Sequence, residues 1–218
     1  MGQRMGSSQT DMSNNDALLR FDSVACQRGG RMLFRGLSFT LNPGDALILS
    51  GPNGVGKSSL LRLAAGLLKP FAGHVERHST LALADENLAL DMDKSLGAAL
   101  DFWAKLDGRN KGDISTAMDA FGIAHLVDVP IRMLSTGQKK RAVLARTISS
   151  GAPLWLLDEP ANGLDTDSIT RLENIVAGHR ADGGAILIAS HQSLIVKDAA
   201  QIILETPVLT VSDWEENA

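Results

Sequence analysis

One glycine-rich segment constrains the fold of this chain more than any other feature. It is Gly51-Pro52-Asn53-Gly54-Val55-Gly56-Lys57-Ser58, which fits the pattern G-x-x-x-x-G-K-[ST]. The apolar run 46–50 precedes it and predicts a strand, and the run 59–68 follows it and predicts a helix. A strand, a glycine-rich loop and a helix in this order are typical of a loop that wraps around a phosphate group. The chain is therefore expected to fold as an α/β protein around this loop.

The residue types in and after this loop suit a nucleoside triphosphate. Small residues allow a close approach to phosphate, and the helix that begins around Ser59 presents free N–H groups and its positive dipole end. Lys57 supplies a cation for the β- and γ-phosphates, and the Ser58 hydroxyl can bind Mg²⁺. A glycine-rich turn that binds nothing is the alternative, and the strand-loop-helix context disfavours it. The loop predicts binding of a nucleoside triphosphate together with Mg²⁺.

Size and composition exclude several other classes of protein. The 218 residues can bury the core of one α/β domain, and a net charge of −4 gives no drive toward nucleic acid. The single cysteine, Cys26, excludes an internal disulfide and suits a reducing cytosol. We expect no transmembrane segment, because the longest apolar run is interrupted by Arg62 and ends at Lys69-Pro70.

The chain divides into a polar tail and one folded domain. Residues 1–16 are rich in Gly, Ser, Gln, Asn and Asp and predict a disordered tail, and residues 17–218 predict a single folded domain. Turn signals at Arg28-Gly-Gly30 and Asn42-Pro-Gly-Asp45 separate short apolar runs, which predict an N-terminal antiparallel β subdomain. These runs are 18–26, 31–34, 37–41 and 46–50.

A helical block, residues 87–150, interrupts the β/α alternation. Ser95 is expected to cap a helix through Leu106, and Asp113 to cap a second helix through Phe121. The alternation then resumes with two dense apolar runs that predict buried parallel strands and with a helix between them. The predicted strands are 154–157 and 185–189, and the predicted helix is 167–177.

Two adjacent carboxylates follow the first of these strands. Asp158 is placed to hold Mg²⁺ at the carboxyl end of the strand, and Glu159 can be turned toward a water near the γ-phosphate. An apolar run followed by two acids is common at the solvated end of an ordinary strand. In a chain that also carries the phosphate loop, the pair predicts hydrolysis of the bound nucleotide.

A second helix terminus with phosphate-binding chemistry lies ahead of that strand. Ser135 and Gln138 fit a capping box, so a helix is expected to begin here and to run to about Ser150. Ser135, the Gly137 amide, Gln138 and the helix dipole can together hold a phosphate. Two such termini far apart in one chain predict that two copies grip each nucleotide. An ordinary capped helix is the alternative.

Taken together, these motifs resemble the ATP-binding-cassette family of ATPases. Residues 51–58 resemble its Walker A motif, 134–138 its signature motif and 154–159 its Walker B motif. Residues 162–165 resemble the D-loop, and His191 resembles the switch histidine. The resemblance covers about residues 17–205.

The resemblance implies a P-loop NTPase with an inserted helical subdomain that binds ATP and Mg²⁺. It implies that Lys57, Glu159 and His191 are catalytic and that Ser58 and Asp158 hold the metal. It also implies a head-to-tail homodimer that encloses two ATP molecules and is opened by hydrolysis. Such subunits work with an integral-membrane permease.

Three positions depart from the family pattern. Thr136 replaces the usual glycine of the signature, and Arg28 stands where an aromatic side chain usually stacks on adenine, so its guanidinium plane is the candidate for that role. The glutamine of the Q-loop is missing, and Asp85-Glu86-Asn87 follows the expected strand. Either Asp85 or Glu86 can reach Mg²⁺ through water, or the segment is an exposed acidic loop.

A closer resemblance is to the ATPase subunit of bacterial cytochrome c maturation systems. It is carried by residues 26–39, 60–67 and 153–165, and by the absence of a C-terminal regulatory domain. It implies a peripheral location on the cytoplasmic face of the inner membrane and coupling of ATP hydrolysis to delivery of haem or release of a haem chaperone. A transporter for another small molecule, or a soluble cassette ATPase that acts on ribosomes or DNA, are the alternatives.

Overall fold

The computed structural model describes residues 16–86, 89–192 and 194–205. The predicted disordered tail lies outside these residues except for Asp16, and so does Asn87 of the acidic loop. In chain order the elements are β1 (Leu19–Arg28), β2 (Arg31–Leu41), β3 (Ala46–Ser50), α1 (Lys57–Ala64), β4 (Ala72–Arg77), β5 (Leu81–Ala84), α2 (Leu96–Leu106), α3 (Lys111–Ala120), η1 (Ala124–Leu126), η2 (Ile131–Met133), α4 (Thr136–Ser149), β6 (Leu154–Asp158), α5 (Thr166–Ala181), β7 (Ala185–Ala189) and β8 (Ala200–Ile203).

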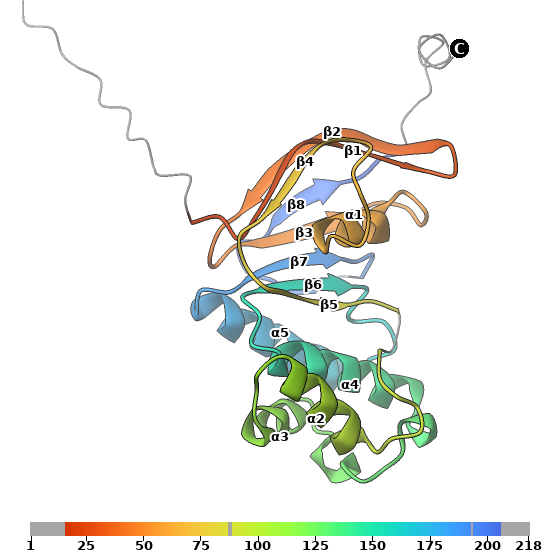
Figure 1. Cartoon of the computed structure of the whole chain (residues 1–218), viewed down its shortest axis with the longest axis vertical. Coiled ribbons are helices and arrows are strands. Elements are labelled where there is room, and N and C mark those ends of the chain that lie inside the picture. The colour runs from red at the N-terminus through yellow and green to blue at the C-terminus, as the bar shows by residue number, and fades with distance from the viewer. Residues whose placement is uncertain (1–15, 87–88, 193, 206–218) are drawn as a thin grey trace, which may run out of the picture.

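The strands form two sheets of different kinds. An antiparallel sheet has the order β2-β1-β4, and a five-stranded parallel sheet has the order β5-β6-β7-β3-β8. In Figure 1 the antiparallel sheet lies at the top, the parallel sheet in the middle and helices α2, α3 and α4 at the bottom. The predicted α/β class with an N-terminal antiparallel part is confirmed. The division into a separate helical subdomain stays a prediction.

The antiparallel sheet differs from its prediction in more than one strand. The run 46–50 forms β3 of the parallel sheet, and β4 pairs with β1 in the antiparallel sheet. The runs 31–34 and 37–41 were expected to be separate strands, but they form the single strand β2. Pairing with β1 continues past the interruption, because Val24 faces Leu37 and Cys26 faces Phe34. One extra residue on β2 is absorbed there as a bulge, and Gly36 supplies the positive φ of 65° within it. A glycine that signals a turn in the sequence is here part of a continuous strand.

The parallel sheet places three carboxyl strand ends beside one another. Strands β6, β7 and β3 are neighbours in that order, and every residue of β7 is buried. The predicted buried parallel strands are therefore confirmed. Because the strands run in the same direction, the segments after Asp158, Ala189 and Ser50 meet at one edge of the sheet. This edge is where the predicted functional residues gather.

The end of α1 and the cap of α3 differ from the sequence prediction. Helix α1 ends at Ala64 rather than near Leu68, because Gly66 takes φ 76° and turns the chain away from the helix. Helix α3 is capped by Asn110, which accepts hydrogen bonds from the N–H groups of Gly112 and Asp113. Asp113 was expected to be the cap. It is instead the third helical residue, and its carboxylate accepts a hydrogen bond from the Asn110 N–H at 3.0 Å.

The other helices begin close to where the sequence predicted. Ser95 caps α2 by accepting a hydrogen bond from the Ala98 N–H at 3.4 Å. Asp165 caps α5 through the Ser168 N–H at 2.8 Å, and α5 begins one residue before the predicted start and ends at Ala181, four residues past the predicted end. Among the described residues, no helix combines the length and the apolar composition needed to cross a membrane.

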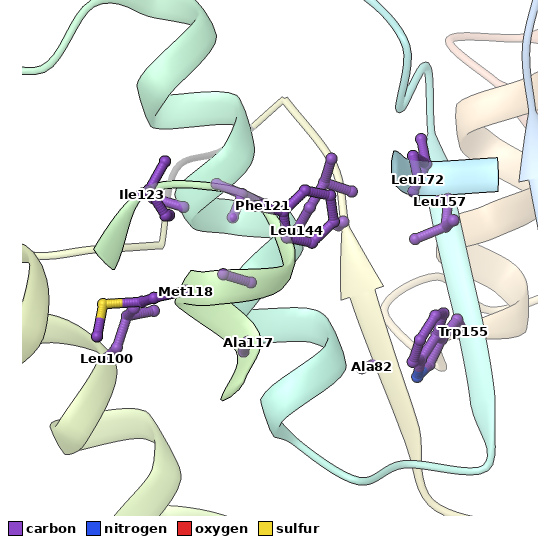
Figure 2. Close-up of a cluster of buried hydrophobic side chains, with 14 of the residues drawn as sticks. Ala82, Leu100, Ala117, Met118, Phe121, Ile123, Leu144, Trp155, Leu157 and Leu172 are labelled. Carbon is purple, nitrogen blue, oxygen red and sulfur yellow. The ribbon is translucent and has the colours of Figure 1, made fainter. Parts of the chain in front are cut away.

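One hydrophobic cluster joins the helical block to the sheet. In Figure 2, Leu144 of α4 and Phe121 lie together, and Trp155 and Leu157 of β6 lie on the other side of Ala82. Phe121 is fully buried, and the cluster extends into α2, α3 and α5. Burial of such side chains stabilises a fold by about 1.5–3 kcal/mol each. This packing fixes the direction of α4 relative to the end of β6.

Candidate functional site

The phosphate loop leads directly into an uncapped helix. Gly56 is the N-cap of α1 with φ 118°, and no side chain accepts a hydrogen bond from the first turn. The first turn of an α-helix has N–H groups without partners inside the helix. At α1 these groups and the positive end of the dipole are left for an anion.

Two glycines of the loop are required by close contacts. A Cβ atom at Gly51 would collide with the carbonyl oxygen of Leu204, and the residue takes φ 133°. A Cβ atom at Gly56 would lie 3.1 Å from the Leu33 Cβ and 3.3 Å from the Phe34 ring. The neighbouring strands therefore hold the loop in one conformation.

The loop and the end of β6 line one cavity of about 300 Å³. Lys57 is only 7% exposed, and its ammonium donates hydrogen bonds to the carbonyl oxygens of Gly51 at 2.7 Å and Pro52 at 3.3 Å. The cavity is lined by Leu33, Asn53, Gly54, Gly56, Lys57, Ser58, Ser59, Asp158 and Glu159. The fold thus brings the two predicted motifs together, although they are far apart in the sequence.

Asp158 and Ser58 form an oxygen-rich pair at the floor of this cavity. Burial raises the pKa of the Asp158 carboxyl above its usual range, and the charges of Glu159 and Asp85 add to the rise. A hydrogen bond with Ser58 and the charge of Lys140 oppose it. A half-buried carboxylate beside a hydroxyl fits Mg²⁺, which prefers oxygen ligands.

The geometry also limits how a metal ion would be held. Across the described ranges, no three His, Cys, Asp or Glu side chains come close enough to form a metal site by themselves. Mg²⁺ commonly takes one or two protein oxygens and completes its shell with phosphate and water. The pair of Ser58 and Asp158 has this character.

Glu159 and His191 meet across the ends of β6 and β7. The Glu159 carboxylate lies 2.8 Å from Nδ1 of His191 and accepts a hydrogen bond from the His191 N–H at 3.3 Å. Glu159 takes φ 44°, an uncommon backbone conformation for this residue type. A hydrogen bond from its N–H to the Ala189 carbonyl, at 2.8 Å, holds it there. The turn directs the carboxylate toward the cavity, as the sequence predicted for a residue just past the strand.

The start of α4 has the predicted capping box. The Gln138 N–H donates to the Ser135 hydroxyl at 3.2 Å, and the Ser135 N–H donates to the Gln138 side-chain oxygen at 2.8 Å. A Cβ atom at Gly137 would lie 2.9 Å from the Gly163 carbonyl oxygen, so the signature and D-loop segments touch. None of Ser135, Gly137 and Gln138 lines the cavity at the phosphate loop. Within one copy, the structure does not bring these residues to that cavity.

Sequence reasoning missed Leu33 at the mouth of the cavity. Arg28, the candidate for base stacking, lies exposed at the β1–β2 hairpin, where it pairs with Arg31. Leu33 of the next strand lines the cavity instead. The continuous apolar run 32–34 marks Leu33 as a candidate for burial, but only the packing of β2 against Gly56 shows that Leu33 lies beside the phosphate loop.

The two acids of the Q-loop position have different surroundings. Glu86 is exposed and lies 3.5 Å from the Arg62 guanidinium. Asp85 acts electrostatically on both Asp158 and Lys140.

Lys140 is a second residue of the site that the sequence analysis missed. Its ammonium donates a hydrogen bond to the Asp158 carbonyl at 3.1 Å. No local signal in the sequence marks it, because lysine is common on the exposed face of a helix.

Comparisons with known proteins agree with this geometry. The family model described as "ABC transporter" matches residues 34–162. The cytochrome c biogenesis ATP-binding export protein CcmA of Sphingopyxis alaskensis is 54% identical over 86% of this chain and 96% of its own length. The protein of the same name from Zymomonas mobilis is 50% identical over 87% of this chain and 86% of its own length.

A solved structure described as an ATP-binding subunit of an ABC transporter shares the fold. It superposes with a TM-score of 0.79 at 20% identity and covers 92% of both chains. The family match spans more than half of the chain and includes the phosphate loop, the signature and β6. The chain therefore belongs to the ABC transporter family of ATPases and, within it, to the CcmA family of cytochrome c biogenesis ATP-binding export proteins.

Proposed function

We propose that this chain hydrolyses ATP to drive a membrane complex in the maturation of c-type cytochromes. The observation that carries the proposal is the 54% identity to the Sphingopyxis alaskensis protein across 96% of that protein's length. A match of this extent includes more than the motifs that bind nucleotide. The cargo step would be haem delivery or release of a haem-loaded chaperone.

In the proposed site, the phosphates of ATP lie against the phosphate loop and the open end of α1. The amides from Gly54 to Ser59 would donate to the phosphate oxygens, and Lys57 would exchange its loop carbonyls for the β- and γ-phosphates. Ser58 and Asp158 would hold Mg²⁺, which neutralises charge on the phosphates when bound. The contact between the two side chains supports this assignment.

Glu159 is the proposed general base. Its carboxylate lines the cavity and is oriented by His191 at 2.8 Å, so it is placed to accept a proton from the attacking water. His191 follows β7, the strand between β6 and β3, and can respond to the γ-phosphate and to Glu159 together. A shift of this pair is the proposed link between the γ-phosphate and the rest of the molecule.

A second copy of the chain would complete each site. Ser135, Gly137 and Gln138 do not line the cavity of their own copy, yet they lie at a helix terminus suited to phosphate. A head-to-tail dimer would bring the signature of each copy to the phosphate loop of the other. Hydrolysis would then release the grip and open the dimer.

The proposed membrane partner would bind beside the acidic loop. A groove of about 600 Å³ includes Asp85, Glu86 and Met92, and the helical block next to it exposes Phe102 and Met133. Haem attachment to c-type cytochromes occurs outside the cytoplasm, whereas ATP is available inside. An ATPase at the cytoplasmic face of the inner membrane therefore has to act through an integral-membrane subunit.

Deletion of the gene tests this proposal. We expect haem staining of cell extracts to show loss of c-type cytochromes, while b-type cytochromes remain. Wild-type protein should restore them, and Lys57→Ala should not. Normal c-type cytochromes in the deletion strain would reject the haem pathway and leave an ABC ATPase that serves another cargo. Co-purification with a membrane subunit tests the partner independently of the cargo.

A further inference from the structure

A half-buried lysine on the signature helix contacts the end of the catalytic strand. Lys140 lies in the second turn of α4, and its ammonium donates a hydrogen bond to the Asp158 carbonyl at 3.1 Å. The side chain thus connects the helix that begins at Ser135 with the strand that ends at Asp158. None of the roles proposed above uses this residue.

The surroundings of Lys140 are acidic. Burial lowers the pKa of the Lys140 ammonium, and the negative charges of Asp158, Glu159 and Asp85 act on that pKa in the opposite direction. These residues come from the ends of β6 and β5, and all of them line the same groove as Lys140. Three negative charges in a half-buried groove repel one another, and an ammonium among them reduces that repulsion.

We propose that Lys140 is a positioning residue that acts as the internal counter-ion of these carboxylates and so sets how strongly the site holds a divalent cation. The positive charge of Lys140 acts on the cation through Asp158, so the side chain does not need to contact the nucleotide. Asp85 has the opposite effect, because its carboxylate adds a negative charge to the same groove. Lys140 lowers the affinity of the site for the cation and Asp85 raises it, so the effects of their two charges offset each other. This inference rests on the proposed Mg²⁺ site at Ser58 and Asp158.

Opposite substitutions should shift cation binding in opposite directions. Lys140→Met removes the positive charge and keeps the side-chain length, so the site becomes more negative and should bind the cation more tightly. Asp85→Asn removes a negative charge and should weaken binding. A unit charge a few ångströms from the ion in a partly solvated site changes affinity by roughly tenfold. The double variant should return to within about threefold of wild type, because the two changes compensate.

The experiment measures binding of Mn²⁺, a paramagnetic substitute for Mg²⁺, by electron paramagnetic resonance. It uses the full-length protein with a non-hydrolysable ATP analogue, so turnover plays no part in the readout. Lys139→Met is the matched control. Lys139 lies next to Lys140 on α4 and lines the same groove, but the hydrogen bond to the Asp158 carbonyl is made by Lys140. The control should shift the Mn²⁺ dissociation constant by less than about twofold, because Lys140 and not Lys139 is among the charges that act on the Asp158 carboxyl.

The outcomes separate this inference from the site on which it rests. If wild-type protein binds no Mn²⁺, or if Asp158→Asn binds it as wild type does, the proposed metal site is wrong. If wild type binds and Asp158→Asn does not, but Lys140→Met leaves affinity unchanged or lowers it, the counter-ion role is rejected. Should Lys140→Met fail to fold, Lys140→Arg and Asp85→Asn decide. Arginine keeps the charge and should keep wild-type affinity, and an unchanged affinity in Asp85→Asn would overturn the proposal.

Discussion

The two helix termini with phosphate-binding chemistry, at the starts of α1 and α4, are built in opposite ways. Gly56 at α1 has no side chain, and no side chain satisfies the first-turn amides there. At α4, Ser135 and Gln138 satisfy each other's backbone N–H groups in a capping box. The first-turn amides of α1 can bind a phosphate without losing a protein hydrogen bond, whereas at α4 the N–H groups of Ser135 and Gln138 already have partners.

The two helix termini are expected to contribute to nucleotide binding in different ways. The open terminus belongs to the cavity that also contains Lys57, Asp158 and Glu159. The capped terminus is stable without a ligand and lies outside that cavity. Most of the affinity of a single copy for the nucleotide should therefore come from the start of α1. The start of α4 should contribute when a second copy closes over the nucleotide. Substitutions at each terminus and at the residues of the cavity separate these two contributions.

Glu159→Gln should give the largest loss of turnover, because it removes the proposed general base. The amide keeps the size of the side chain but accepts a proton poorly, and general-base catalysis contributes about 10²–10⁴ in rate. ATP should still bind, and the stalled state should appear as a dimer in light scattering. Glu76→Gln on the antiparallel sheet is the control and should behave as wild type. Turnover near wild type would show that another residue orients the water.

Lys57→Ala tests the open terminus directly. We expect ATPase activity to fall by about 10²–10³, the usual cost of removing an electrostatic group aimed at the transition state. ATP affinity should fall as well, because α1 carries primary binding. Activity and equilibrium binding of a fluorescent ATP analogue measure the two effects. Lys105→Ala, a surface change on α2, is the control. Substantial turnover by Lys57→Ala would reject the assignment of the phosphate loop.

His191→Ala should lower turnover by roughly tenfold and leave ATP affinity nearly unchanged. The residue orients Glu159 at 2.8 Å, so its loss acts on the transition state more than on the bound ground state. Gln192→Ala, one residue further on, should have little effect. A parallel loss of affinity and turnover would mean that His191 belongs to the binding surface of the open terminus.

Ser135→Ala should have the smallest effect on the isolated chain and tests the capped terminus. Loss of a capping hydroxyl costs about 1 kcal/mol in the free energy of unfolding, which urea denaturation would measure. ATP affinity of a single copy should stay within about twofold of wild type, while turnover of the dimer falls. Ser95→Ala removes the matching cap of α2 and should cost similar stability without loss of turnover. Equal turnover in the two variants would show that the α4 terminus does not contact phosphate.

Local patterns predicted most of the elements because each has a local cause. Buried parallel strands were visible as apolar runs, and the caps at Ser95 and Ser135 as hydroxyls at helix starts. The errors at 31–41 and at Asp113 arose where a neighbour decides the outcome. Strand β1 pairs across Gly36 and makes one strand of two runs, and Asn110 caps its helix three residues before the expected cap at Asp113.

For the site, the chemistry of each part could be predicted from local patterns in the sequence. Five side chains were identifiable because each lies in a recognisable local setting, which is a glycine-rich loop, the end of a strand or a helix cap. They are Lys57, Ser58, Asp158, Glu159 and Ser135. The tertiary structure alone decided which parts meet. The order β6-β7-β3 brings Glu159, His191 and the phosphate loop to one edge of the sheet.

The tertiary structure also brings Asp85, after β5, and Lys140, on α4, to one shared groove. Neither the groove nor the placement of Leu33 over the phosphate loop follows from local spacing. Contacts between residues far apart in the chain depend on which strands become neighbours. That choice is made by packing of the whole core, which no short segment of the sequence contains.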